Sequence, residues 1–95
     1  MNTSTAQLID KEQVAGLKFP KEEVLTDQKA IKERQSTLER GMTLGNLQKQ
    51  KSRIYFKDDK SEKVVETTIW AVTSNFILLK YGISIPINRI LKIKF

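Results

Sequence analysis

Two neighbouring stretches decide the fold: SRIYFKD at residues 52–58 and KVVETTIWAVT at residues 63–73. In the first, charged or aromatic residues alternate with Ile54 and Phe56, and this period of two is typical of a strand with one apolar face. The second stretch alternates in the same way, so both are predicted strands. Because the polar residues DDKSE lie between them, we predict a turn there and therefore a hairpin.

Three further short strands are predicted after the hairpin. They are NFILLKY at 75–81, ISIPI at 83–87 and LKIKF at 91–95. Pro86 has no N–H to donate, so the fourth strand ends there or leaves that position unpaired. The inward positions of the five strands form the predicted core: Ile54, Phe56, Val65, Ile69, Leu79, Ile85 and Ile93.

A helix is predicted within residues 27–42. Thr26 or Asp27 is a suitable N-cap, and apolar residues follow at helical spacing. The end of the helix has two interpretations: Gly41 closes it at C′, or the helix continues past Leu47.

The length of 95 residues fits one small domain. Residues 1–25 show no sustained periodicity and are predicted to be a flexible N-terminal segment. Residues 26–95 are the predicted domain, in which the helix precedes a five-stranded antiparallel barrel over 52–95. The predicted fold class is therefore α+β, mostly β, with a small Sm-like or SH3-like barrel.

The composition argues against most enzyme classes. The chain has no Cys and no His, so it has no thiol nucleophile, no Cys-based metal site and no imidazole base. We expect neither an enzyme nor a cofactor or metal site. The N-terminal sequence MNTSTAQLIDKEQ lacks the features of a signal peptide, and the apolar run at 76–79 is too short to span a membrane. These features predict a cytoplasmic protein without a membrane partner.

The positive charge lies in the second half of the chain. Residues 1–48 hold seven Lys or Arg and seven Asp or Glu, whereas residues 49–95 hold ten and four, which accounts for the net charge of +6. Such a basic half favours an anionic partner, because Lys and Arg that neutralise phosphates supply most of the sequence-independent affinity for nucleic acid. Solubility is the alternative explanation.

The outward side of the hairpin is the first candidate binding surface. Its cations and flat rings are suited to stacking on unpaired bases. Its members are Arg53, Tyr55, Lys57, Lys63 and Trp70. In the alternative interpretation, Tyr55 and Trp70 are covered by the apolar side of the helix.

Two smaller clusters have competing interpretations. A cationic strip, formed by Lys80, Arg89, Lys92 and Lys94, is either a phosphate track or protection of a sheet edge against pairing. An acidic hairpin tip, formed by Asp58, Asp59 and Glu62, is either a site for a hard cation or a solvated turn. The spacing does not fit a calcium loop, which favours the turn.

The order of these elements resembles the Sm-like barrel of bacterial proteins. The resemblance is to the host factor Q RNA chaperone family in particular. The shared order is a helix, a strand reading IYF, a polar hairpin, a long strand, then FILLK, a tight turn and a short strand leading into RI. The resemblance covers residues 44–95 and also fits the Rho-inhibitor family, which has the same barrel. Where the chaperone family has a bending glycine this chain has Thr67, and where it presents a Tyr-Lys-His-Ala segment to RNA this chain has Pro86, Ile87, Asn88 and Arg89.

The resemblance implies a barrel more directly than it implies an RNA site, since fold alone does not define function. Only Arg89 keeps a cationic, hydrogen-bonding side chain at that turn. Two hypotheses follow. One is a small nucleic-acid-binding or RNA-associated regulator, with single-stranded RNA as its expected partner. The other is a protein-interaction module such as the Rho-inhibitor likeness implies. Lys92, Lys94 and Pro86 oppose strand pairing between copies, which predicts a monomer.

Overall fold

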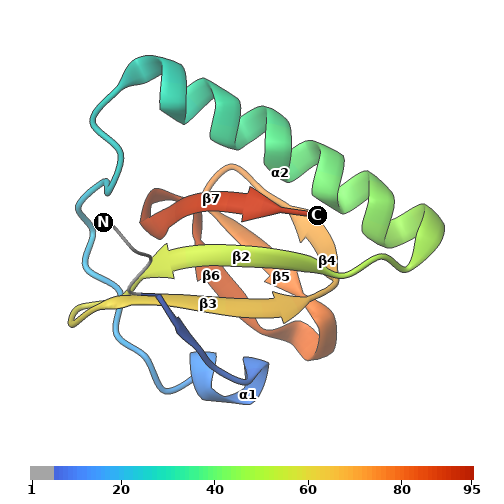
Figure 1. Ribbon diagram of the computed structural model, residues 1–95, viewed down its shortest axis with the longest axis horizontal. Coiled ribbons are helices and arrows are strands. Elements are labelled where there is room, and N and C mark those ends of the chain that lie inside the picture. Colours follow the sequence, from blue (N-terminus) through green and yellow to red (C-terminus); the bar gives the residue numbers. More distant parts are fainter. Residues whose placement is uncertain (1–5) are drawn as a thin grey trace.

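The computed structural model describes residues 6–95 as an α+β fold with one long helix and seven strands in two sheets (Figure 1). The helices are α1 (Lys11–Val14) and α2 (Gln28–Gln48), with single 3-10 turns η1 (Lys80–Gly82) and η2 (Ile87–Arg89). The strands are β1 (Gln7–Leu8), β2 (Ser52–Lys57), β3 (Glu62–Thr67), β4 (Ile69–Val72), β5 (Phe76–Leu79), β6 (Ser84–Pro86) and β7 (Ile90–Lys94).

The strands form a four-stranded sheet in the order β1-β3-β2-β7 and a three-stranded sheet in the order β4-β5-β6. We call them sheet A and sheet B. The expected count was five strands, and two differences account for the seven observed. The predicted strand at 63–73 is divided at Thr68 into β3 in sheet A and β4 in sheet B, and β1 adds a short parallel pair at residues 7–8. Thr67, where a sharp bend was uncertain, is therefore the last residue before the chain changes sheets.

The alternation of the strands places the core as predicted. Strand β2 pairs antiparallel with β3 and with β7, so the apolar side of the hairpin faces the interior. All seven predicted core residues are buried, and Ile54, Phe56 and Ile69 have no exposed surface. The prediction of these strand faces is confirmed.

Helix α2 begins at the predicted position and extends to Gln48, beyond the predicted range of 27–42. Asp27 is the N-cap, and its Oδ1 accepts a hydrogen bond of 3.1 Å from the backbone N–H of Lys29. The helix continues to Gln48 and ends at Lys49, whose φ of 57° lies in the left-handed region. Of the two interpretations, the longer helix is the one observed. Gly41 does not end the helix; it lies against β4, where a Cβ would be 3.0 Å from Cδ1 of Ile69.

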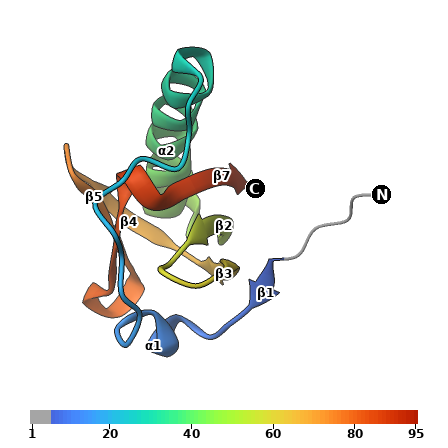
Figure 2. The ribbon, with the colours of Figure 1, turned by 90° about the vertical axis from the view of Figure 1, so that its left-hand side faces the viewer.

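The segment before α2 is held against the sheets. Residues 6–25, which were expected to be flexible, contain β1, α1 and the buried side chain of Val14, which is 1% exposed. Residues 17–24, called the strap below, pass beside η2 (Figure 2). The backbone N–H of Asp59 donates to the carbonyl of Lys18, and the N–H of Val24 donates to the carbonyl of Asn88. Residues 1–5 of the predicted flexible segment lie outside the described residues.

Candidate functional site

Part of the predicted binding surface forms a cluster on the outer side of sheet A. In the β2–β7 ladder, Arg53 lies opposite Lys94 and Tyr55 lies opposite Lys92. The Nζ atoms of Lys92 and Lys94 are 4.9 Å and 5.9 Å from the centre of the Tyr55 ring, within the range of cation–π attraction. We call these four residues the cationic face. The structure thus combines the first predicted surface with two lysines of the cationic strip.

Glu66 of β3 lies opposite Arg53 in the β2–β3 ladder, but the cations of the cationic face form no ion pair among residues 6–95. Among residues 6–95, the ion pairs are Lys11–Glu12, Arg34–Glu23 and Lys63–Asp58, and none involves the cationic face. Lys57, the other outward cation of β2, is exposed at the end of the same strand. Strand β7 brings only cations because residues 74–95 contain no carboxylate side chain. The surface is therefore suited to an anionic ligand.

Two predicted binding residues have their polar atoms engaged inside the fold. The Lys63 side chain is 12% exposed, and its Nζ lies 2.6 Å from Oδ2 of Asp58. Arg89 is 6% exposed and donates to the backbone carbonyls of Lys57, Asp58 and Glu22 at 2.9, 3.1 and 2.7 Å. Arg89 therefore joins the hairpin to the strap, and Lys63 stabilises the hairpin turn.

The remaining two predicted residues lie away from the cationic face. Trp70 belongs to β4 in sheet B and is 44% exposed, while Tyr55 in sheet A is half-buried. Neither ring is fully covered by α2, contrary to the alternative interpretation. Lys80 begins η1, where its Nζ is 5.4 Å from the centre of the exposed Tyr81 ring.

The acidic hairpin tip forms a hydrogen-bonded turn. Asp58 is 2% exposed and accepts hydrogen bonds from the backbone N–H groups of Lys60 and Ser61 and from Lys63. Burial alone would raise the pKa of Asp58, but these hydrogen bonds outweigh it and lower the pKa to about 2. Among the described residues, no group of three or more acidic side chains is placed to hold a metal ion. The tip is thus a structural turn.

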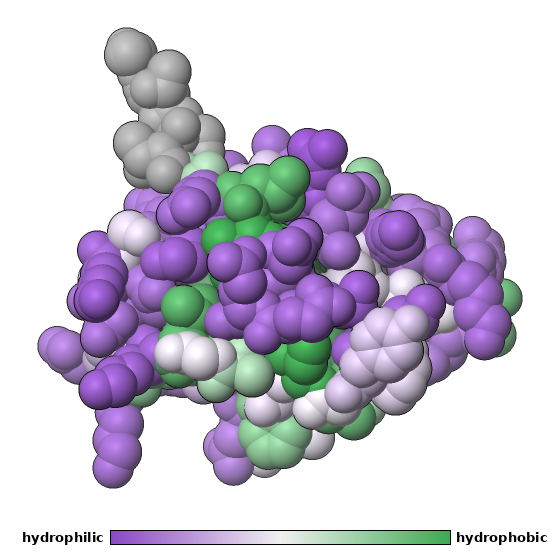
Figure 3. Space-filling model, turned by 90° about the horizontal axis from the view of Figure 1, so that it is seen from below, coloured by the Kyte–Doolittle hydropathy of each residue, from purple (hydrophilic) through white to green (hydrophobic). Residues whose placement is uncertain are grey.

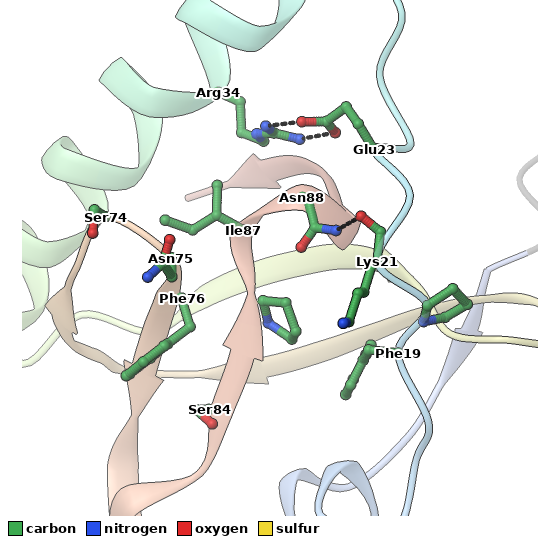
Figure 4. A pocket seen from close by; sticks show the side chains of 12 residues that line it. Phe19, Lys21, Glu23, Arg34, Ser74, Asn75, Phe76, Ser84, Ile87 and Asn88 are labelled. Carbon is green, nitrogen blue, oxygen red and sulfur yellow. Dashed lines mark hydrogen bonds and ion pairs between the residues drawn. The ribbon is translucent and has the colours of Figure 1, made fainter.

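A groove that the sequence did not indicate lies between the strap and strands β5 and β6. Its volume is about 720 Å³, and Figure 4 shows side chains from both walls. The strap contributes Phe19, Pro20 and Lys21, and the opposite wall contributes Asn75, Phe76, Ser84, Pro86 and Asn88. Sequence patterns could not reveal this groove because its walls are more than fifty residues apart in the chain.

Apolar side chains are exposed on the face of the molecule seen in Figure 3. Viewed from below, hydrophobic side chains reach the surface at several places among hydrophilic ones (Figure 3). Large apolar side chains with 40% or more of their surface exposed include Phe76 and Phe95. Among the described residues, no helix has the length and apolar character needed to cross a membrane.

Comparisons with known proteins return no relatives. No protein-family model, no curated protein and no solved structure matches this chain. The cationic face and the groove are thus the two surfaces on which a function can be proposed.

Proposed function

We propose that this protein is a small, non-enzymatic, RNA-associated regulator that binds single-stranded nucleic acid through the cationic face. The observation that carries the proposal is the Tyr55 ring with the Nζ atoms of Lys92 and Lys94 at 4.9 and 5.9 Å from its centre and Arg53 on the same strand. None of these cations forms an ion pair among residues 6–95. An aromatic ring can stack on a base only where the base is unpaired, and neighbouring cations neutralise the phosphates. A cytoplasmic location is part of the proposal.

The proposal includes a strongly bent Sm-like barrel as the architecture. Two connections support it, because each passes from one sheet to the other over very few residues. Thr68 alone separates β3 from β4, and η2 alone separates β6 from β7. Two sheets joined at both sides in this way have the connectivity of a small barrel wall.

The first prediction concerns salt dependence. Binding of a fluorescein-labelled uridine oligonucleotide, followed by fluorescence anisotropy, should weaken about tenfold to twentyfold between about 50 and 200 mM salt if about three cations contact phosphates. The double variant Lys92→Ala/Lys94→Ala should bind more weakly at low salt. Because two phosphate contacts are lost, its log–log salt slope should be shallower by about 1.4.

A matched control removes two lysines elsewhere. Lys29→Ala/Lys32→Ala, on the exposed side of α2, changes the net charge by the same amount and should leave the salt slope unchanged. Equal slopes for the two double variants, or equal affinity for a duplex of the same length, would reject the cationic face as a single-strand site.

The protein-interaction hypothesis is favoured by a different observation. The groove beside β6 is lined mainly by apolar and uncharged polar side chains, and of its charged residues Glu23 and Arg34 form an ion pair with each other. A protein partner, if there is one, therefore fits the groove better than sheet A.

A further inference from the structure

The groove offers an apolar surface that the fold leaves partly uncovered. Pro86 lies opposite Phe76 in the β5–β6 ladder, and Phe76 is 40% exposed. The half-buried Phe19 of the strap lines the same groove (Figure 4). The inner side of Phe19 is anchored, because its ring centre is 5.9 Å from that of Phe56 in the core. Apolar grooves with a few fixed polar groups are the usual form of a binding site.

Strand β6 leaves backbone groups free along this groove. The N–H of Leu79 donates to the carbonyl of Ile83, and the N–H of Ile87 donates to the carbonyl of Asn75. Since hydrogen-bonded and non-hydrogen-bonded pairs alternate in an antiparallel ladder, Ile85 directs its polar groups toward β5, and Ser84 directs its own away from β5. The N–H and the carbonyl of Ser84 therefore face the free edge of sheet B, which adjoins the groove.

Two asparagine side chains add further unused hydrogen-bonding groups. Asn88 donates through Nδ2 to the carbonyl of Lys21 at 2.7 Å, while its Oδ1 accepts no bond from residues 6–95 and points into the groove (Figure 4). The carboxamide of Asn75, on the opposite wall, has no partner among the described residues. A carboxamide presents the same donor and acceptor as a peptide bond, so these groups match the main chain of an extended peptide.

The free charge in the groove is a single cation. The Lys21 side chain extends from the strap into the groove and has no ion pair within residues 6–95 (Figure 4). The carboxylate of Glu23 is occupied, because it receives two hydrogen bonds of 2.6 and 2.7 Å from Arg34. One lysine is too little for a phosphate chain, whose binding depends on several cations, but it is sufficient to select an acidic side chain.

We propose that the groove binds an extended acidic peptide segment of a partner protein. An apolar or aromatic side chain of the peptide packs on Pro86 beside Phe76, its main chain bonds to Ser84 and the asparagines, and a carboxylate pairs with Lys21. This site lies between the strap and sheet B, so it is separate from the cationic face on sheet A. The protein would then connect a nucleic acid to a protein partner.

The experiment measures binding of the full chain to two peptide arrays. In the first array each peptide is about ten residues long and has one aromatic residue beside an Asp or Glu. In the second array Lys replaces the acidic residue. The wild-type protein should bind a subset of the acidic peptides and none of their lysine counterparts. Lys21→Glu should reduce that binding about tenfold and transfer the preference to the lysine array. Lys29→Glu, the matched reversal on α2, should leave the preference unchanged.

Amide NMR spectra locate the binding site. The selected peptide should shift the resonances of Asn75 and Ser84, and a uridine oligonucleotide should shift those of Tyr55 and Lys92. Shifts of Asn75 and Ser84 caused by the oligonucleotide instead would assign the groove to nucleic acid and overturn the proposal. It is also overturned if no peptide binds in a way that depends on Lys21, whatever the outcome for the cationic face.

Discussion

Asp58 shows how one charged residue stabilises the hairpin beneath the strap. Its carboxylate is almost completely buried and holds two backbone N–H groups and the Lys63 ammonium, while its backbone carbonyl accepts from Arg89. Its pKa is about 2 in the folded protein, compared with an ordinary value of 3.8. The folded state therefore favours the ionised form of Asp58.

This pKa predicts a loss of stability in acid. A carboxyl group whose folded pKa is lowered stabilises the fold above its unfolded pKa, and this contribution disappears as the pH falls through the folded pKa. Asp58 should contribute about 2 kcal/mol near neutral pH, lost between about pH 4 and 2. Urea unfolding of Asp58→Asn should show this deficit at pH 7 and little difference from wild type near pH 2. Asp59→Asn, at the exposed neighbouring position, is the control, and an equal deficit in both variants would contradict the assignment.

Glu23 adds a second acid-sensitive contact at the strap. The side-chain hydrogen bonds from Arg34 lower the pKa of Glu23, although burial partly opposes them. Arg34 also donates to the carbonyl of Ile90 at 3.0 Å, so this pair connects the strap, α2 and β7. Because its pKa is lowered, ionised Glu23 also stabilises the folded state, and this stabilisation is lost in acid as it is for Asp58.

At the scale of elements, α2 is positioned by a close approach to β4. A Cβ at position 45 would lie 2.6 Å from the carbonyl oxygen of Ile69, and Ile69 itself is completely buried. Glycine is normally unfavourable inside a helix, by about 1 kcal/mol relative to alanine. Its presence in α2 is explained by the space it leaves for the backbone of β4.

Gly45→Ala should therefore destabilise the protein despite the better helix propensity of alanine. The neighbouring atom is backbone and cannot move independently, so overpacking should cost about 1–3 kcal/mol, measured as the shift in the urea midpoint. Gly16→Ala is the control, because its Cβ would meet only the carbonyl oxygen of Gln13 at an ordinary 3.8 Å. A higher midpoint for Gly45→Ala would show that α2 does not pack as closely as described.

Over the whole molecule, the edge strands β6 and β7 each lie beside another segment of the same chain. Helix α2 lies along β7, where Arg34 binds the carbonyl of Ile90, and the strap lies beside β6. Pro86 removes one donor from β6, and Lys92 and Lys94 discourage pairing on β7. Helix α2 leaves little of β7 for a strand of another copy, and β6 offers one outward N–H, that of Ser84, because Pro86 has none.

We therefore predict a monomer in dilute solution. Sedimentation at micromolar concentration should give the mass of one chain, 10.9 kDa. A hexamer or heptamer would show that the edges pair between copies.

The alternating pattern predicted the seven core side chains of the strands, although Val64, on the predicted outward side of β3, is also buried. Alternation is a local property, because successive residues of a strand point to opposite sides whatever lies around them, and Ile54, Phe56 and Ile85 followed it. The N-cap at Asp27 was predictable for the same reason, since its hydrogen bond spans only two residues. Two cations of the binding surface, Arg53 and Lys92, were likewise expected to face outward.

Which polar residues are available to a ligand depends on contacts between distant parts of the chain. Arg89 had the character of a phosphate ligand in the sequence, yet its partner Glu22 is 67 residues away, and no local pattern predicts such a contact. The close approach of Gly45 to the backbone of Ile69 is also a tertiary contact, which the sequence did not predict. The groove also depends on the tertiary structure, because Lys21 and Asn75 line the same groove only once the strap lies beside sheet B. The direction of a side chain in a strand is set by the local backbone. The residues that it contacts are set by the path of the whole chain.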